Sequence, residues 1–183
     1  MSTDMSNPTH VTVEEIERAI RNVPDFPKAG IQFKDITPVL ENARLFAGCI
    51  DLLTNHIKPG TIDTVVGIDA RGFIFAAAAA LKLRAGFVPV RKKGKLPYQT
   101  FEESYDLEYG SNTVAIHTDA VKAGARVLLV DDLLATGGTA AAAASLLKKV
   151  GADIVAINFI IELGFLAGRK KLHGLPVHSL VVY

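Results

Sequence analysis

The stretch that decides the fold reads Val127-Leu128-Leu129-Val130-Asp131-Asp132-Leu133-Leu134-Ala135-Thr136-Gly137-Gly138-Thr139. An unbroken apolar run is typical of a β-strand that is buried on both faces, and it predicts a strand over 126–130. The strand is expected to end at Val130, so that Asp131 and Asp132 follow at its carboxyl end, where open α/β sheets bind their ligands. We therefore expect a ligand site at this end of the strand.

The residues after the strand indicate what that ligand is. Carboxylates only accept hydrogen bonds, and an adjacent pair suits the vicinal hydroxyls of a ribose. The turn over 136–139 can direct N–H groups and hydroxyls at a phosphate, ahead of a helix that begins near Thr139. A nucleotide-hydrolysing P-loop would require lysine where Gly138 stands. The pattern thus predicts a sugar-phosphate site, since a plain turn capped by Thr139 would leave the paired aspartates without a purpose.

The segments around this stretch predict an α/β fold. Strands that alternate with crossover helices favour a largely parallel central sheet flanked by helices. Alanine tracts at 76–80 and 140–144 favour helix and would allow a close approach to the sheet. The expected strands are 64–68, 87–90, 126–130 and 154–161, and the expected helices are 13–22, 42–57, 73–82 and 139–150.

Two segments interrupt the alternation. Residues 25–39, which contain prolines and a glycine, are predicted to form an irregular hood or connector. Residues 91–115 are polar with interspersed aromatic residues, and a loop of that length in a compact domain is often a functional lid. We expect one domain over 1–183, with a disordered tail at 1–10, an N-terminal helix and hood over 11–40 and a lid over 91–115.

Composition narrows the possible partners. The chain has 183 residues, of which 49% are hydrophobic and 21% charged, as in a globular protein. Its net charge of +1 gives no broad positive field for nucleic acid or an anionic membrane. The longest apolar run, 73–81, is far shorter than the ~20 residues that cross a bilayer. A single cysteine, Cys49, and an N-terminus without the features of a signal peptide predict a cytoplasmic location.

The stretch over 127–139 closely resembles the phosphoribosyl pyrophosphate (PRPP) signature of the type I phosphoribosyltransferases. Five further blocks, in family order, look like those of the adenine-specific members: 25–27 (DFP), 33–40 (FKDITPVL), 67–73 (GIDARGF), 91–97 (RKKGKLP) and 104–110 (SYDLEYG). The resemblance implies the type I phosphoribosyltransferase fold, with a largely parallel central sheet flanked by helices, a small N-terminal hood and a mobile lid loop. One departure is Ala70, where many relatives carry serine.

The resemblance also implies an activity. The chain would transfer the phosphoribosyl group of PRPP to N9 of adenine, giving AMP and pyrophosphate in purine salvage. Mg²⁺ would be required, bound mainly through the substrate, and a homodimer is expected. The alternatives are a related transferase for hypoxanthine, guanine or xanthine and a PRPP-sensing regulator that binds DNA, although no basic helix-turn-helix segment is visible.

Residue roles follow from the same resemblance. Glu108, on the lid, is expected to stabilise charge near N7 of the base, and Arg71 and Lys95 complete the catalytic set. Phe33 would stack on adenine, with Gln32 and Lys34 reading its edge and Leu163 packing opposite. The ribose and 5′-phosphate residues are Asp131, Asp132, Ala135, Thr136, Gly137, Gly138 and Thr139. The pyrophosphate residues are Ala70, Arg71, Arg91, Lys92, Lys95 and Tyr109.

Overall fold

The computed structural model describes residues 10–106 and 111–183. These residues form two compact units, Met1–Leu52 and Leu53–Tyr183, and each is described by itself. The expectation of a single domain stays a prediction.

The first unit opens with a capped helix and a short β-hairpin. Helix α1 (Val13–Ala19) begins at a capping box, in which Thr12 Oγ1 accepts from the Glu15 N–H and the Thr12 N–H donates to the Glu15 carboxylate. The helix ends at Ala19, so the helix expected over 13–22 was too long. Strand β1 (Arg21–Pro24) pairs antiparallel with β2 (Gln32–Asp35). Pro24 favours an extended conformation at the residue before it, which explains a strand where helical spacing predicted a helix.

The hood is more regular than expected. Within 25–39 the structure contains β2 and the start of helix α2 (Thr37–Glu41), so the prediction of an irregular connector was wrong for these residues. Phe26 and Phe33 meet edge to face, with ring centroids 5.1 Å apart. Helix α3 (Ala43–Thr54) occupies most of the helix expected over 42–57.

The second unit is built on a seven-stranded sheet with the order β5-β6-β4-β3-β7-β8-β9. All neighbouring pairs among β4, β3, β7, β8 and β9 are parallel, and only β5 and β6 add antiparallel pairs. The strands are β3 (Thr64–Ile68), β4 (Gly86–Lys92), β5 (Thr100–Asp106), β6 (Ser111–His117), β7 (Arg126–Leu134), β8 (Asp153–Glu162) and β9 (Val177–Val182). The expected largely parallel sheet is confirmed.

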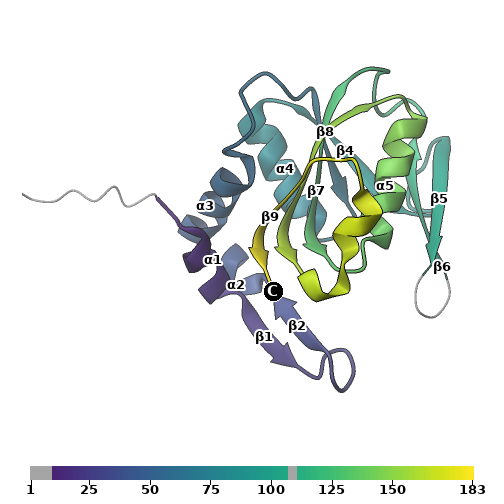
Figure 1. Cartoon of the computed structure of the whole chain (residues 1–183). Helices are drawn as coiled ribbons and strands as arrows, with labels where there is room; N and C mark the ends of the chain where they lie inside the picture. Colours follow the sequence, from purple (N-terminus) through teal and green to yellow (C-terminus); the bar gives the residue numbers. More distant parts are fainter. Residues whose placement is uncertain (1–9, 107–110) are drawn as a thin grey trace, which may run out of the picture. The chain divides into compact units, whose positions relative to one another are not determined.

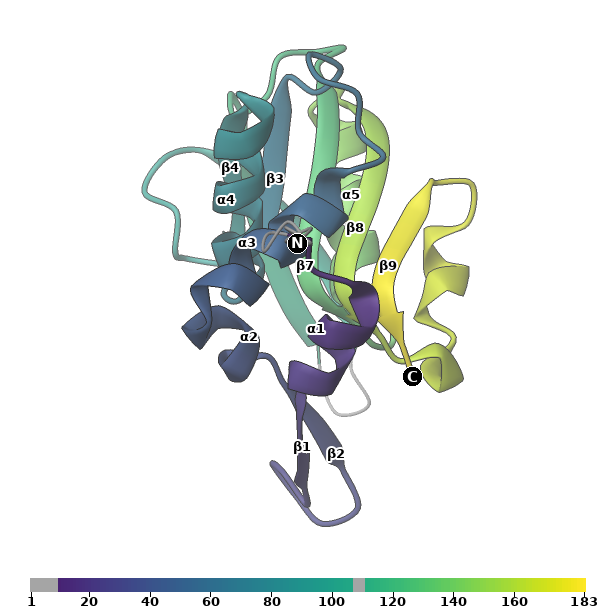
Figure 2. The same ribbon diagram turned by 90° about the vertical axis from the view of Figure 1, so that its left-hand side faces the viewer.

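Helices cover both faces of this sheet. Helix α4 (Gly72–Leu83) packs on β3, β4 and β7, whereas α5 (Gly138–Lys149) packs on β5, β6, β7 and β8. Figures 1 and 2 show the two helices on opposite sides of the sheet. A Cβ on Gly67 would lie 2.7 Å from the Cβ of Ala76, so glycine on β3 and alanine on α4 together permit the close approach expected from the alanine tracts.

Strand β7 forms the centre of the core and is longer than expected. Residues 127–130 have no exposed surface, in agreement with a strand buried on both faces. The strand does not end at Val130 but continues to Leu134, because its pairing with β8 extends to the contact between Leu134 and Glu162. Asp131 and Asp132 therefore lie within the strand, near its carboxyl end, rather than after it.

The expected lid over 91–115 is largely a β-hairpin. Strands β5 and β6 pair from Thr100 opposite His117 to Asp106 opposite Ser111. Ser104 and Thr113 share a cross-strand hydrogen bond of 2.9 Å. The loop prediction was thus wrong for 100–106 and 111–115, because exposed paired strands need no apolar alternation. Residues 107–110 of the expected lid lie outside the described residues.

Two short 3₁₀ helices and an unpredicted edge strand complete the second unit. They are η1 (Gly164–Leu166), η2 (Gly168–Leu172) and β9, which extends the sheet beside β8. Among residues 10–106 and 111–183, no helix is both long and apolar enough to cross a membrane.

Candidate active site

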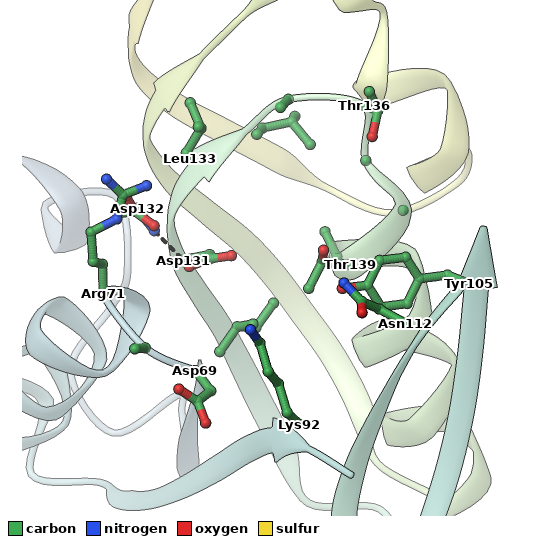
Figure 3. A pocket seen from close by; sticks show the side chains of 17 residues that line it. Asp69, Arg71, Lys92, Tyr105, Asn112, Asp131, Asp132, Leu133, Thr136 and Thr139 are labelled. Carbon is green, nitrogen blue, oxygen red and sulfur yellow. Dashed lines mark hydrogen bonds and ion pairs between the residues drawn. The ribbon is translucent and has the colours of Figure 1, made fainter. Parts of the chain in front are cut away.

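A cavity of about 420 Å³ opens at the carboxyl ends of β3 and β7. Polar and charged side chains from several elements converge on it, and Figure 3 shows Arg71, Lys92, Asp131 and Asp132 around the same space. Its lining consists of Ile68, Asp69, Ala70, Arg71, Lys92, Tyr105, Asn112, Asp131, Asp132, Leu133, Leu134, Ala135, Thr136, Gly137, Gly138, Thr139 and Ala140.

Two helices begin at this cavity. Helix α4 follows Arg71 and helix α5 follows Gly137, and neither helix start has a side-chain cap. Uncapped N–H groups at a helix start carry partial positive charge and bind anions. The cavity is therefore suited to a ligand with anionic groups at two separate places.

The two aspartates lie between these helix starts. Asp132 is buried, with 6% of its surface exposed, and its carboxylate forms an ion pair with Arg71 over 2.8 Å (Nε to Oδ2). The N–H of Asp132 donates to Asp131 Oδ1 over 2.9 Å. Apart from these contacts the two carboxylates present acceptor oxygens to the cavity, as a polyhydroxyl ligand requires.

Burial raises the pKa of both carboxyl groups above the ordinary value of 3.8. For Asp131 the negative charge of Asp132 raises the pKa further, whereas for Asp132 the Arg71 guanidinium partly offsets the effect of burial. Such perturbed carboxyl groups in a cleft indicate a functional site, because stability alone does not favour them.

Glycines keep the walls of the cavity close together. A Cβ on Gly72 would lie 2.5 Å from Asp131 Oδ1 and 3.2 Å from the carbonyl oxygen of Val130. Gly137 has a φ of +77° and lies against the backbone of Gly168, where a Cβ would collide with the Gly168 carbonyl. These two positions therefore require glycine for steric reasons.

The structure brings most of the expected PRPP residues to one cavity. All seven ribose and 5′-phosphate residues line it, and so do Ala70, Arg71 and Lys92 of the pyrophosphate group. Arg91 and Lys95 are not among the lining residues. The Arg91 guanidinium donates to Asp69 over 3.1 Å and to the Lys95 carbonyl over 3.2 Å, so that it braces the backbone beside the cavity.

The remaining expected residues lie elsewhere. Gln32, Phe33 and Lys34 belong to β2 in the first unit, and Leu163 directly follows β8 in the second. Glu108 and Tyr109 lie outside the described residues. Their expected roles stay predictions.

Three polar lining residues, Asp69, Tyr105 and Asn112, had been given no role. Tyr105 and Asn112 are paired across the β5–β6 hairpin, and Figure 3 shows them together at one side of the cavity. The Tyr105 ring would lie 3.0 Å from a Cβ on Gly138, so it packs directly against the start of α5. Asp69 and Tyr105 stand in the family-like blocks 67–73 and 104–110 and could have been found there, whereas no local pattern distinguishes Asn112 within the polar stretch.

Metal binding has no dedicated cluster in the part of the chain that the structure describes. There, no group of three or more His, Cys, Asp or Glu side chains is arranged to hold a metal ion. Asp131 and Asp132 provide hard oxygen donors beside the space for a ligand, which suits a hydrated Mg²⁺ carried by a phosphorylated substrate.

Comparisons with known proteins agree with this fold and this site. Residues 35–173 match the family model of the phosphoribosyl transferase domain, which defines the class of protein. An adenine phosphoribosyltransferase of Acidothermus cellulolyticus is 54% identical over 92% of this chain and 95% of its own length. One from Thermobifida fusca is 50% identical over 98% of both chains. The chain therefore belongs to the adenine phosphoribosyltransferase family.

Solved structures support the same assignment. The adenine phosphoribosyltransferase of Thermoanaerobacter pseudethanolicus matches with a TM-score of 0.91 and 50% identity, covering 94% of this chain and 100% of that chain. The Saccharomyces cerevisiae enzyme, solved with an imino-altritol bisphosphate and adenine, has a TM-score of 0.85 and 42% identity over 92% and 97% of the two chains. The expected type I phosphoribosyltransferase fold is confirmed.

Proposed function

We propose that this chain transfers the phosphoribosyl group of PRPP to N9 of adenine, giving AMP and pyrophosphate. One observation carries the proposal: two adjacent aspartates, the partly buried Asp131 and the buried Asp132, lie in a single cavity with two uncapped helix starts. PRPP has this distribution of groups, with ribose hydroxyls between a 5′-phosphate and a pyrophosphate. The names of the relatives add adenine as the acceptor.

The 5′-phosphate and the ribose are assigned to β7 and the start of α5. Residues 136–139 offer backbone N–H groups and two threonine hydroxyls, which suit a phosphate dianion. Asp131 and Asp132 would accept hydrogen bonds from the ribose hydroxyls. Binding at these two points fixes the sugar, so that C1′ faces a single direction in the cavity.

Pyrophosphate is assigned to the start of α4. Ala70, Arg71 and Lys92 line this side of the cavity, and the positive end of α4 adds to their charge. Arg71 forms an ion pair with Asp132, which holds the guanidinium beside the cavity.

The chemical step forms a bond between N9 and C1′ as the bond from C1′ to the pyrophosphate oxygen breaks. Arg71 and Lys92 would stabilise the negative charge that develops on the departing pyrophosphate. We propose Glu108 as the group that stabilises positive charge near N7 of the purine, with Lys95, Arg91 and Tyr109 supporting the pyrophosphate after closure of the lid. Exclusion of water would protect the activated sugar from hydrolysis.

Adenine is assigned to Phe33 of the first unit, with Gln32 and Lys34 at the edge of the base, and the role of Leu163 stays a prediction. The edge contact between Phe33 and Phe26 supports this assignment, because it holds the Phe33 ring in a fixed plane within the hood. A stacked base gains affinity from a ring that is already ordered before binding.

Three further properties are proposed. Mg²⁺ would bind mainly through PRPP, where it would neutralise the charge on the pyrophosphate; on the protein side, Asp131 and Asp132 are the nearest oxygen donors.

A cytoplasmic location fits the single cysteine, because burial raises the pKa of the Cys49 thiol to about 12 and makes it unreactive. A homodimer fits an exposed apolar face on α4, formed by Ile74 and Leu81 with the nearby Phe87.

A purine panel tests the proposal. The protein is incubated with PRPP, Mg²⁺ and adenine, hypoxanthine, guanine or xanthine, and the nucleotide product is identified by chromatography. AMP formation from adenine, with at most slow turnover of the other bases, is expected, because a hydrogen-bonding pocket discriminates amino from oxo groups strongly. If only hypoxanthine, guanine or xanthine were converted, the acceptor would be one of these 6-oxopurines rather than adenine. If the protein bound DNA and formed no nucleotide, it would instead be a PRPP-sensing regulator.

A further inference from the structure

An ion pair between the buried Glu162 carboxylate and the more exposed Arg169 guanidinium lies next to the proposed 5′-phosphate site but not in it. Glu162, the last residue of β8, accepts from Arg169 Nε over 3.0 Å and again from the other end of the guanidinium. Ser179 on β9 donates its hydroxyl to the same carboxylate over 2.6 Å. Arg169 also donates to the Val177 carbonyl over 2.7 Å. We call Glu162, Arg169 and Ser179 the β8–β9 clamp.

The clamp fixes the start of η2 to the sheet. Arg169 is the second residue of η2, and Gly168 is the first. Because the guanidinium bonds to β8 and β9 at once, the backbone that carries Arg169 is held in one place and orientation. Only one peptide bond separates this anchored residue from Gly168.

Gly168 in turn lies against the proposed phosphate loop. A Cβ on Gly168 would lie 2.8 Å from the Gly137 nitrogen and would collide with the Ala135 carbonyl, and a Cβ on Gly137 would collide with Gly168. The two backbones are therefore in direct contact without intervening side chains. This contact supports the turn whose N–H groups are assigned to the 5′-phosphate.

Loss of Arg169 is expected to have a large effect on the clamp, because the carboxylate that it pairs with is buried. Only 6% of the Glu162 surface is exposed, and the hydrogen bonds from Arg169 hold its pKa below the ordinary value. Loss of the guanidinium would leave a buried carboxylate with a single hydroxyl donor, which is unfavourable in the native position. The segment that follows Glu162 would then be expected to shift so that the carboxylate reaches water.

We propose that Arg169 is a positioning residue for the 5′-phosphate, acting through Gly168 on the backbone of 135–137. The proposal rests on the proposed function, since that function assigns the 5′-phosphate to this loop. It does not require Arg169 to touch the substrate. Arg169 is not among the lining residues of the cavity.

The test compares Arg169→Met with a matched control, Arg126→Met. Arg126 forms an equally well-ordered pair with Asp63, through Nε over 3.0 Å and NH2 over 2.7 Å. The two arginine side chains are similarly exposed, at 46% and 43%. Arg126 is the first residue of β7, at the end of the strand away from Asp131 and Asp132. The control therefore removes an arginine pair without affecting the phosphate loop.

Binding of ribose 5-phosphate and of inorganic pyrophosphate to the full chain is measured by titration calorimetry. Arg169→Met is expected to weaken ribose 5-phosphate binding about tenfold, as for loss of one well-placed charged hydrogen bond, and to leave pyrophosphate within about twofold. In turnover assays the KM for PRPP should rise while kcat at saturation changes little. Arg169→Lys should fall between, since one ammonium group cannot reach both strands in the same way.

Three results would overturn the clamp. The first is unchanged ribose 5-phosphate affinity in Arg169→Met. The other two are an equal loss for both ligands and the same loss in Arg126→Met, since either would indicate a general effect on folding. Amide hydrogen exchange of 135–139 provides a readout that needs no substrate, and it should rise in Arg169→Met alone. If the natural protein makes no AMP but amide hydrogen exchange of 135–139 rises in Arg169→Met, the proposed function is wrong, whereas support of the loop by Arg169 is confirmed. If exchange stays unchanged, the clamp fails irrespective of activity.

Discussion

Asp131 and Asp132 are placed for binding at a cost to the stability of the ligand-free chain. Burial raises the pKa of both groups, so at neutral pH the folded chain holds them ionised less readily than the unfolded chain does. We predict that Asp131→Asn raises the free energy of unfolding of the ligand-free protein at pH 7.5, because the neutral amide avoids the cost of burying the ionised carboxylate. The same variant should weaken PRPP binding, because the amide replaces an acceptor oxygen.

The direction of the Asp131 pKa shift determines how the stability difference between Asp131→Asn and the natural protein changes with pH. A raised folded pKa means that protonation stabilises the fold, so the contribution is fully present below the ordinary value of 3.8 and is lost as pH rises through the folded pKa. The stability advantage of Asp131→Asn should therefore shrink as pH falls from neutrality towards 3.8. Chemical denaturation at several pH values measures it. An advantage that is constant with pH would assign the effect to packing.

Gly137 combines an unusual backbone conformation with a close contact, and the chain allows the two to be separated. Gly60 has a similar φ, +74° against +77°, but open space around its missing Cβ. Gly60→Ala should cost about 1–2 kcal/mol of stability through backbone strain alone. Gly137→Ala should cost this and also raise the KM for PRPP more than tenfold, because the new methyl group displaces Gly168 and the loop. Thermal unfolding and steady-state kinetics of both variants decide between strain and displacement; equal kinetic effects would contradict the close contact.

At the level of residues, the chemistry was predictable where it is encoded locally. Asp131, Asp132 and the turn over 136–139 are consecutive in sequence, and the structure places them on one cavity as expected. Tyr105 and Asn112 reach the same cavity through the pairing of two strands. The role of Asn112 could not be predicted because a cross-strand contact depends on register, which polar strands without apolar alternation do not specify.

The β5–β6 hairpin is attached to α5 through an ion pair and a hydrogen bond of Lys149. The Lys149 ammonium pairs with the Glu103 carboxylate and also donates to the Glu102 carbonyl over 3.2 Å. Both side chains of the pair are partly exposed, so the pair is worth about 0.5 kcal/mol. We predict that Lys149→Met increases hydrogen exchange along β5 and raises the KM for PRPP only about twofold.

The neighbouring lysine provides the control for this prediction. Lys148→Met removes the same charge from the last turn of α5, where cations interact favourably with the helix dipole. If both variants change exchange along β5 equally, the effect comes from the helix rather than from the contact with Glu103. A change confined to Lys149→Met supports anchoring of the hairpin by this pair.

Elements differ in how clearly the sequence encodes them. Strand β3 was predicted at its observed bounds, because four of its five residues are β-branched and it lies between two parallel neighbours. Strands β1, β2, β5, β6 and β9 were missed, and all of them lie in a hairpin or at an edge of the sheet. Such strands are stabilised by pairing with distant residues, whereas local residue patterns report burial.

For the molecule as a whole, the proposed homodimer has a specific surface. On α4, Ile74 and Leu81 are two turns apart and face solvent, with 40% and 83% of their surfaces exposed, and Phe87 of β4 is 39% exposed. Alanines 77 and 78 lie between them on the same face, so nothing bulky prevents a close approach of a second helix. The near-neutral net charge of +1 opposes self-association only weakly.

We predict that Leu81→Glu dissociates this dimer. A two-fold interface buries Leu81 twice, and loss of about 1.5–3 kcal/mol per leucine raises the dissociation constant on the order of a hundredfold or more. Sedimentation equilibrium over a range of concentrations measures it. Lys148→Glu, which places a new carboxylate on the exposed end of α5, should leave the dimer intact. A natural protein that is monomeric at all concentrations would exclude the homodimer, whereas a dimer unaffected by Leu81→Glu would place the interface on another surface.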